Sequence, residues 1–262
     1  TSPSGNLAPA NISVLEVNSG AIVTGAVIDI GAPVVTQIPP TINSPCIQTP
    51  NNICVEEGVY TYTITLPPIA GGYYVVYQRC CRNNTIVNLL NSGSQSSTYY
   101  TKIPGLEAAP NNSSPRFLNF PPIFLCNNLA FTFNHAALDP DGDNLVYSLC
   151  PPFLGIDGCC NFVGQAGQPQ AGPLCDNPPP ICPQIAPPPP YQLVNYVAPY
   201  DGSYPVAANP SLTIDPNTGL LKGTPNMIGQ YVVGVCVQEF RNNVLISTHF
   251  RDFQFNIVPC VV

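Results

Sequence analysis

The chain has 262 residues, enough for one large domain or two of ordinary size, and its 45% apolar content is sufficient for a packed core. Only 8% of the residues are charged, and seven basic against 14 acidic side chains leave a net charge of −7. So few basic residues cannot form the positively charged face that binding to nucleic acid or to an anionic membrane surface requires, so both are excluded as partners. The 33 prolines argue against a helical protein, and no apolar run reaches the roughly 18 residues of a membrane span.

Alternation of apolar and polar residues predicts the strands. In residues 59–66, Tyr60, Tyr62 and Ile64 fall on one face and threonines on the other. Further strands are predicted at 73–79, 130–134, 145–150, 231–238 and 250–258. Turn-forming proline, glycine and asparagine separate these segments, and short strands divided by turns are typical of an all-β sandwich.

A short internal repeat suggests two domains. Gly72-Tyr73-Tyr74-Val75-Val76 leads to Arg82-Asn83-Asn84, and Gly229-Gln230-Tyr231-Val232-Val233 leads to Arg241-Asn242-Asn243. Each copy predicts a strand, an Asn-Asn hairpin and a following strand, although chance recurrence is the alternative. We therefore predict two tandem Ig-like or cadherin-like β-sandwich domains, at 1–108 and 113–262, joined by a polar, proline-bounded linker over 108–115.

The second predicted domain contains a proline-rich insertion at about 151–190. It ends in four consecutive prolines and Tyr191. Such a run favours polyproline II and cannot lie inside a sheet, so we expect a surface loop held by its cysteines.

The chain contains twelve cysteines. Their spacing lacks the Cys-x2-Cys pairs of zinc sites, so disulfides and an oxidising, extracellular or cell-surface location are predicted. One pairing, Cys46–Cys54, is expected, and the rest of the connectivity is left open. The disulfide candidates are Cys46, Cys54, Cys80, Cys81, Cys126, Cys150, Cys159, Cys160, Cys175, Cys182, Cys236 and Cys260.

The densest acidic segment is Asp139-Pro140-Asp141-Gly142-Asp143. Three alternating carboxylates suit a hard cation with oxygen ligands, so Asp139, Asp141 and Asp143 are candidate Ca²⁺ ligands, with Asn119 or Asp252 contributing. An EF-hand is excluded because Asn144 and Cys150 occupy the positions that need glycine and glutamate. The alternative is an ordinary turn, built from turn-forming residues.

No catalytic arrangement is predicted. The adjacent Glu56 and Glu57 point to opposite faces of a strand, and neither histidine has a neighbour that would form a dyad. Arg79 and Arg82 are expected to pair with Glu56 or Glu57 at the surface, and the alternative is that they recognise a ligand. Tyrosine is abundant, and an exposed row of tyrosines beside asparagine and aspartate would indicate a carbohydrate-binding module instead.

Two groups of motifs resemble known families. Residues 138–149 (LDPDGDNLVYSL) and 211–237, with the IDPNTG segment, resemble cadherin-like or Ig-like repeats of bacterial surface proteins. Residues 55–84, with RCCRNN, and 113–123 resemble the N-terminal module of large secreted proteins of Bacteroidetes, called gliding-motility-associated or PKD-domain-containing, many of which carry a type IX sorting domain. This resemblance implies a surface location and no enzymatic activity.

The expected function is therefore that of a non-catalytic, extracellular structural or adhesive protein, with self-association or other surface proteins, or glycans, as partners. Relative to the resembled module the chain begins after the opening strand pair, which predicts an empty slot at a strand edge within 1–108. Residues 1–54 contain only Glu16 and Asp29 as charged residues to protect such an edge. We expect the slot to be filled by a segment cleaved from the same precursor or by a strand of the next subunit, which would build a filament, and the alternative is that the sequence is simply truncated.

Overall fold

The computed structural model describes residues 10–23, 27–39, 47, 55–79, 81–155 and 186–260. Within these residues the chain forms fifteen strands and one 3-10 helix, η1 (Ser92–Ser94), which confirms the all-β fold class. The strands are β1 (Asn11–Glu16), β2 (Ile28–Asp29), β3 (Val34–Gln37), β4 (Glu56–Val59), β5 (Tyr73–Arg79), β6 (Ser97–Ile103), β7 (Arg116–Phe117), β8 (Phe124–Cys126), β9 (Phe131–Asn134), β10 (Ala137–Leu138), β11 (Asn144–Leu149), β12 (Thr213–Ile214), β13 (Leu220–Gly223), β14 (Gly229–Arg241) and β15 (Val244–Val258).

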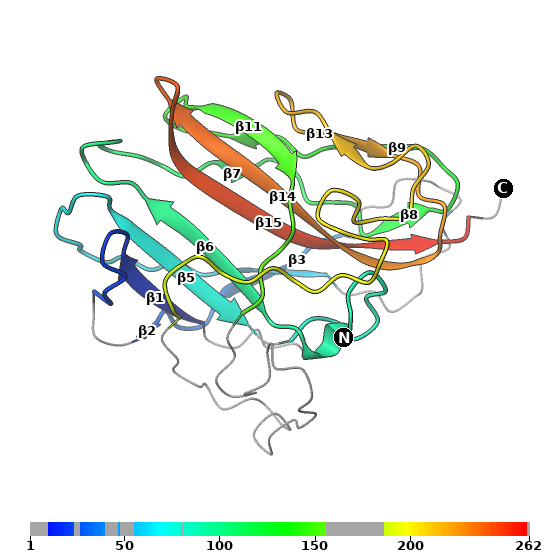
Figure 1. Ribbon diagram of the computed structural model, residues 1–262, viewed down its shortest axis with the longest axis horizontal. Helices are drawn as coiled ribbons and strands as arrows, with labels where there is room; N and C mark the ends of the chain where they lie inside the picture. The colour runs from blue at the N-terminus through cyan, green and yellow to red at the C-terminus, as the bar shows by residue number, and fades with distance from the viewer. Residues whose placement is uncertain are drawn as a thin grey trace, which may run out of the picture.

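The largest sheet is built on the long hairpin of β14 and β15, in the order β11-β14-β15-β8 (Figure 1). The predicted strands at 145–150, 231–238 and 250–258 are confirmed as parts of β11, β14 and β15. Asn242 and Asn243 close the hairpin with φ values of 52° and 63°, a left-handed backbone that asparagine tolerates better than most residues.

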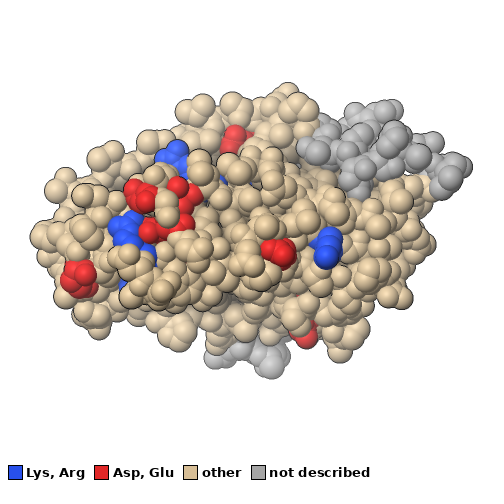
Figure 2. Space-filling view, turned by 90° about the horizontal axis from the view of Figure 1, so that it is seen from above, with Lys and Arg blue, Asp and Glu red and all other residues tan. Residues whose placement is uncertain are grey.

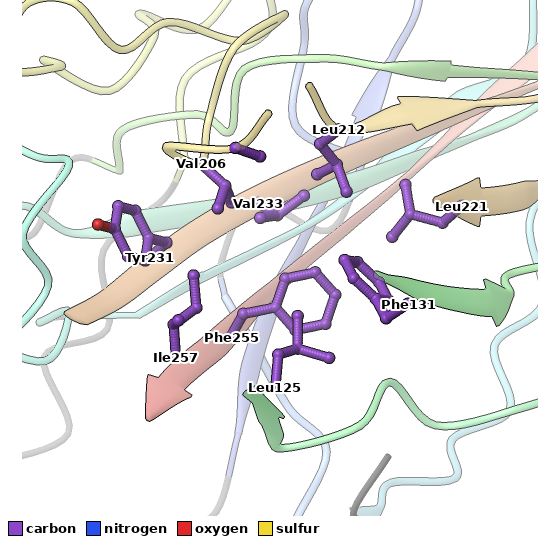
Figure 3. Close-up of a cluster of buried hydrophobic side chains, with 10 residues drawn as sticks. Leu125, Phe131, Val206, Leu212, Leu221, Tyr231, Val233, Phe255 and Ile257 are labelled. Atoms are coloured by element: carbon purple, nitrogen blue, oxygen red, sulfur yellow. The ribbon is translucent and has the colours of Figure 1, made fainter. Parts of the chain in front are cut away.

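One face of this sheet packs against the smaller sheet β12-β13-β9. Alternate residues of the hairpin, among them Tyr231, Val233 and Phe255, are fully buried there against Phe131 and Leu221 (Figure 3). The period-2 pattern therefore directs alternate apolar side chains of these strands into one shared core.

A second sheet has the order β2-β1-β5-β6, and β5 confirms the strand predicted at 73–79. The strand predicted at 59–66 is wrong beyond Val59, where β4 ends. Its partner β3 pairs Val34 with Val59 and begins directly after Pro33. Since proline has no N–H to donate to a ladder, the pairing stops at this point.

The first copy of the internal repeat does not form a hairpin. Asn83 and Asn84 lack the left-handed backbone of their counterparts, and the Asn83 side chain accepts hydrogen bonds from the N–H and hydroxyl of Thr85 instead. The chain then runs through η1 before it returns as β6. An identical tripeptide thus forms two different turns, because its neighbours differ.

Residues from both predicted domains pack together. Ile86 and Leu89 share a buried cluster with Leu154, Val194 and Val232. The open edge of β6 lies along β15 (Figure 1), with the Ser247 hydroxyl donating to the carbonyl of Lys102 at 3.2 Å. The boundary predicted near residues 108–113 is thus bridged by shared apolar packing, and the division into two domains stays a prediction.

Two disulfides crosslink the sheet β11-β14-β15-β8, called the main sheet below. Cys150–Cys236 joins the segment after β11 to β14, and Cys126–Cys260 joins β8 to the residues after β15. Cys81 is also disulfide-bonded. The expected Cys46–Cys54 bond lies outside the described residues, as do Cys80, Cys159, Cys160, Cys175 and Cys182 and most of the predicted 151–190 insertion.

Candidate metal centre

The predicted acidic segment forms a tight turn between β10 and β11. One carboxylate oxygen of Asp139, Oδ1, accepts hydrogen bonds from the backbone N–H groups of Asp141 and Asp143, at 2.9 and 3.0 Å. Gly142 has a φ of 80°, a left-handed conformation in which a side chain would be strained. The Oδ1 atom of Asp139 therefore stabilises the turn.

Three carboxylates converge at this turn. Asp139, Asp143 and Glu239 each offer an oxygen, and these oxygens lie within 4.8 Å of one another. We call these three residues the acidic cluster. Two were predicted from the sequence, but Glu239 was not, because it arrives from β14, about a hundred residues away. The sequence offers one sign of this: Glu239 lies on the same face of the strand as Val233, Val235 and Val237, which are all buried.

The third predicted ligand, Asp141, lies at the margin of the cluster. Its Oδ2 accepts a hydrogen bond from the backbone N–H of Ser113 at 2.5 Å and lies 3.6 Å from Arg241 Nη2. The expected contributors Asn119 and Asp252 are engaged elsewhere: the Asn119 side chain donates to the carbonyl of Asn134, and Asp252 pairs with Arg82. Glu239 takes the place that was assigned to them.

Arg241 supplies a positive charge to the cluster. Its Nε and Nη2 atoms donate to the two carboxylate oxygens of Asp143, at 2.8 and 2.6 Å. This bidentate hydrogen bond lowers the pKa of Asp143 and raises that of Arg241. The Arg241 guanidinium, together with His249 beside Glu239 when that ring is protonated, supplies fewer positive charges than the carboxylates of Asp139, Asp141, Asp143 and Glu239 supply negative ones.

One carboxylate oxygen of the cluster has no partner. Asp139 is only 9% exposed, and its Oδ2 is buried without a hydrogen bond. A buried anionic oxygen without a donor is unfavourable, and a cation would compensate it. An open hollow lined by Asp141, Asp143, Arg241 and the Asn242-Asn243 turn gives solvent access to this region. Figure 2 shows acidic and basic side chains gathered at one end of a largely uncharged face.

A chain of hydrogen bonds connects the cluster to the predicted linker and to β6. Glu239 accepts from the Asn112 amide at 2.9 Å and, through its other oxygen, from His249 Nε2 at 2.9 Å. His249 Nδ1 lies 3.1 Å from the Thr101 hydroxyl. Arg241 donates to Asn112 Oδ1 at 2.9 Å. The linker is therefore held against β14 by the same residues that surround the acidic cluster.

The pairing expected for Arg82 is wrong. Its guanidinium lies 2.5 Å from a carboxylate oxygen of Asp252, and both side chains are at most 10% exposed. Burial raises the pKa of Asp252, and the facing Arg82 opposes that rise. Glu57 instead lies beside the Thr36 hydroxyl in the two-stranded sheet of β3 and β4.

The tyrosines do not form an exposed row. All 13 lie in the described ranges, and only Tyr62 is exposed, at 49%. Tyr73, Tyr147 and Tyr231 are buried, and the others are partly covered. The helix content of the described chain is a single three-residue turn, far too short to cross a membrane.

Comparison of the chain with models of known protein families, with curated proteins and with solved structures finds no match in any of the three.

Proposed function

We propose that this protein is a non-catalytic, extracellular structural or adhesive protein whose acidic cluster binds Ca²⁺. The observation that carries the proposal is the unpartnered Oδ2 of Asp139, buried beside the carboxylates of Asp143 and Glu239. Since the cluster is bonded to Asn112, a bound ion would also fix the segment between the two predicted domains.

The disulfides support the extracellular part of the proposal. Cys126–Cys260 and Cys150–Cys236 both crosslink strands of the main sheet, and such bonds persist in oxidising compartments. The resemblance to Bacteroidetes surface modules is in keeping with this location, and within it the protein would serve as one module of a larger surface protein.

Strand exchange at the first sheet is not part of the proposal. The outer edge of β1 is occupied by the chain itself: the N–H of Val23 donates to the carbonyl of Val14, and the N–H of Glu16 to the carbonyl of Ala21. Farther along, β2 pairs with Asn11 and Ile12. The backbone groups of Val14 and Glu16 at this edge are thus already paired within the chain.

The carbohydrate-binding alternative has no comparable support. A sugar-binding face needs a row of exposed aromatic rings beside polar groups, and within the described residues the exposed aromatic rings are only those of Tyr62 and Phe120. The carboxylates of Asp201 and Asp215, on the surface, accept hydrogen bonds from the N–H groups of their own turns.

Thermal unfolding with Ca²⁺ and with a chelator tests the proposal. An ion that binds only the folded state, at 100 times its Kd, adds about 2.7 kcal/mol, which corresponds to a rise in Tm of roughly 5–10 °C for a chain of this size. Asp139→Asn keeps the Oδ1 acceptor that shapes the turn but weakens the site, so we expect this variant to lose the calcium-dependent rise.

Asp215→Asn is the matched control, because Asp215 also accepts N–H bonds within its own turn, at 2.8 Å from Thr218 N, but lies outside the acidic cluster. This variant should keep the full rise in Tm. Identical Tm values for the wild type in calcium and in chelator would contradict the proposal and leave the segment as an ordinary turn.

A further inference from the structure

A small apolar groove lies where the β3–β4 sheet meets the segment before β8. It is lined by Ile38, Val55, Phe120, Pro121, Ile123 and Phe253. Phe120 forms part of its wall and is 48% exposed, although phenylalanine is usually buried. Three distant parts of the chain thus present apolar side chains to one open depression.

Arg251 does not line the groove but lies close to two residues that do, Phe120 and Phe253. It lies on the same face of β15 as Phe253, two residues away, and its Nη1 donates to the carbonyl of Asn119, the residue before Phe120, at 2.9 Å. Its guanidinium carbon lies 4.6 Å from the centroid of the Phe117 ring. The side chain is thereby held in a fixed position beside the apolar lining.

Among the residues that the structure describes, Arg251 has no acidic partner. The ion pairs of the described chain use Arg82, Arg241 and His249 and leave Arg251 aside. Burial lowers the pKa of Arg251 to about 10. The adjacent His135, whose ring is buried among Phe117, Phe133 and Phe253, brings no negative charge, since imidazole is neutral or positive.

A half-buried guanidinium without a counter-ion reduces folding stability, and a carboxylate brought by a ligand would compensate it. The groove is open along one side, so it suits one or two side chains of an extended segment better than a long acyl chain, which needs an enclosed cavity. The charge of Arg251 therefore calls for a carboxylate in the ligand, and the shape of the groove calls for short apolar side chains beside it.

We propose that Arg251 and this groove bind an apolar peptide segment of another protein through a glutamate or aspartate side chain. The carboxylate pairs with the Arg251 guanidinium, and the neighbouring aliphatic side chains of the peptide cover Phe120 and Ile123. The proposal adds a binding site to the structural role and is independent of calcium, because the acidic cluster lies elsewhere.

The test uses the capped peptide acetyl-Ala-Val-Glu-Val-Ala-amide and its counterpart with glutamine in place of glutamate, titrated into isotopically labelled protein and followed by NMR. We expect the glutamate peptide to bind at least ten-fold more tightly, since a charge-assisted hydrogen bond is lost in its counterpart. The amide signals of Phe120, Ile123 and Gln254 should shift. Arg251→Gln should reduce the preference below two-fold, and Arg116→Gln, at an exposed arginine, should leave it intact.

Equal binding of the two peptides, absence of binding by both, or a preference that survives Arg251→Gln would overturn the proposal. Hexanoate that binds more tightly than the glutamate peptide would assign the site to a free aliphatic acid and overturn the peptide as occupant. The Tm of Arg251→Met provides a separate check. If Arg251 serves binding, the Tm of this variant should be unchanged or raised. A Tm lowered by more than about 5 °C would show that Arg251 stabilises the fold.

Discussion

Two buried ionisable side chains, Asp252 and His135, differ in whether a charged partner compensates their burial. Asp252 faces Arg82 at 2.5 Å and has a compensating charge. His135 is fully buried, both of its ring nitrogens lack hydrogen-bond partners, and three phenylalanine rings surround it. Burial raises the pKa of Asp252, and Arg82 opposes that rise, whereas burial lowers the pKa of His135 and the nearby Arg251 lowers it further.

His135 is expected to make stability depend on pH. Burial lowers its pKa to about 3, with Arg251 contributing, while the unfolded chain binds a proton near pH 6.5. Stability from this group is complete above about pH 6.5 and is lost as the pH falls towards 3, by about 3 kcal/mol between pH 7 and pH 4. Urea unfolding of the wild type and of His135→Phe at both values measures the effect.

His135→Phe should lose about 3 kcal/mol less than the wild type over the same interval, because phenylalanine cannot take up a proton and fits among the same rings. At pH 7 we expect the variant to be at least as stable as the wild type, since it no longer buries two unpartnered nitrogens. Parallel pH dependence of the two proteins would show that the proton uptake occurs at other groups.

Only those residues of the acidic cluster that lie close together in the sequence could be predicted from it. Asp139 and Asp143 were found because alternating carboxylates in one short segment must approach one another. Glu239 depends on the register of β11 against β14, which pairs Leu145 with Glu239. A single sequence does not contain that register, so the third carboxylate could not be assigned.

At the scale of single elements, strands in the core follow the sequence pattern more closely than those at the margins. β14 and β15 pair along almost their whole length, and their alternation matches the buried face. Residues 60–66 alternate as clearly, yet they form no strand in the described part of the structure. Alternation indicates which face can be buried, but a strand also requires a partner with free backbone groups.

The Asn242-Asn243 turn provides a test at this scale. Asn243 has a φ of 63°, and an alanine in that conformation costs about 1–2 kcal/mol. We therefore expect Asn243→Ala to destabilise the protein by roughly that amount in urea unfolding. Asn84→Ala is the control from the other copy of the repeat and should change stability by less than about 0.5 kcal/mol, because Asn84 is exposed and its backbone is not left-handed.

A loss of stability of similar size in both variants would indicate that the asparagine side chains, and not the backbone conformation, account for the effect. Asn243→Gly separates these causes, since glycine adopts the left-handed conformation without strain and should be as stable as the wild type or more so.

For the whole molecule, the principal question is whether the two predicted domains unfold together. Arg82 and Asp252 come from opposite sides of the predicted boundary, and so do the residues of the cluster that contains Ile86 and Val232. The composition and alternation predict two β-rich units, but they carry no information about the surface between them. That surface depends on contacts between residues more than 140 positions apart, such as Asn88 and Val232.

Arg82→Met tests this coupling. Removal of Arg82 leaves the buried carboxylate of Asp252 without a counter-charge, and we expect a loss of about 3–5 kcal/mol. Because the ion pair joins both predicted domains, the whole unfolding transition should shift as one, when followed by far-ultraviolet and by tyrosine near-ultraviolet circular dichroism. The exposed Arg116→Met serves as control, with a change below about 0.5 kcal/mol. Two separate transitions, of which only one moves, would show that the domains unfold independently.

The Cys126–Cys260 bond determines how the main sheet would bear a mechanical load. Tension applied at residue 260 reaches β8 through a covalent bond before it acts on the hydrogen bonds between β15 and its neighbours, each of which contributes only about 1 kcal/mol. β15 therefore cannot be peeled from its C-terminal end without carrying β8 with it. In an oxidising environment β8 and β15 would therefore resist the tension together. Reduction of this one bond would leave the C-terminal end of β15 held only by hydrogen bonds, and we expect it to detach first.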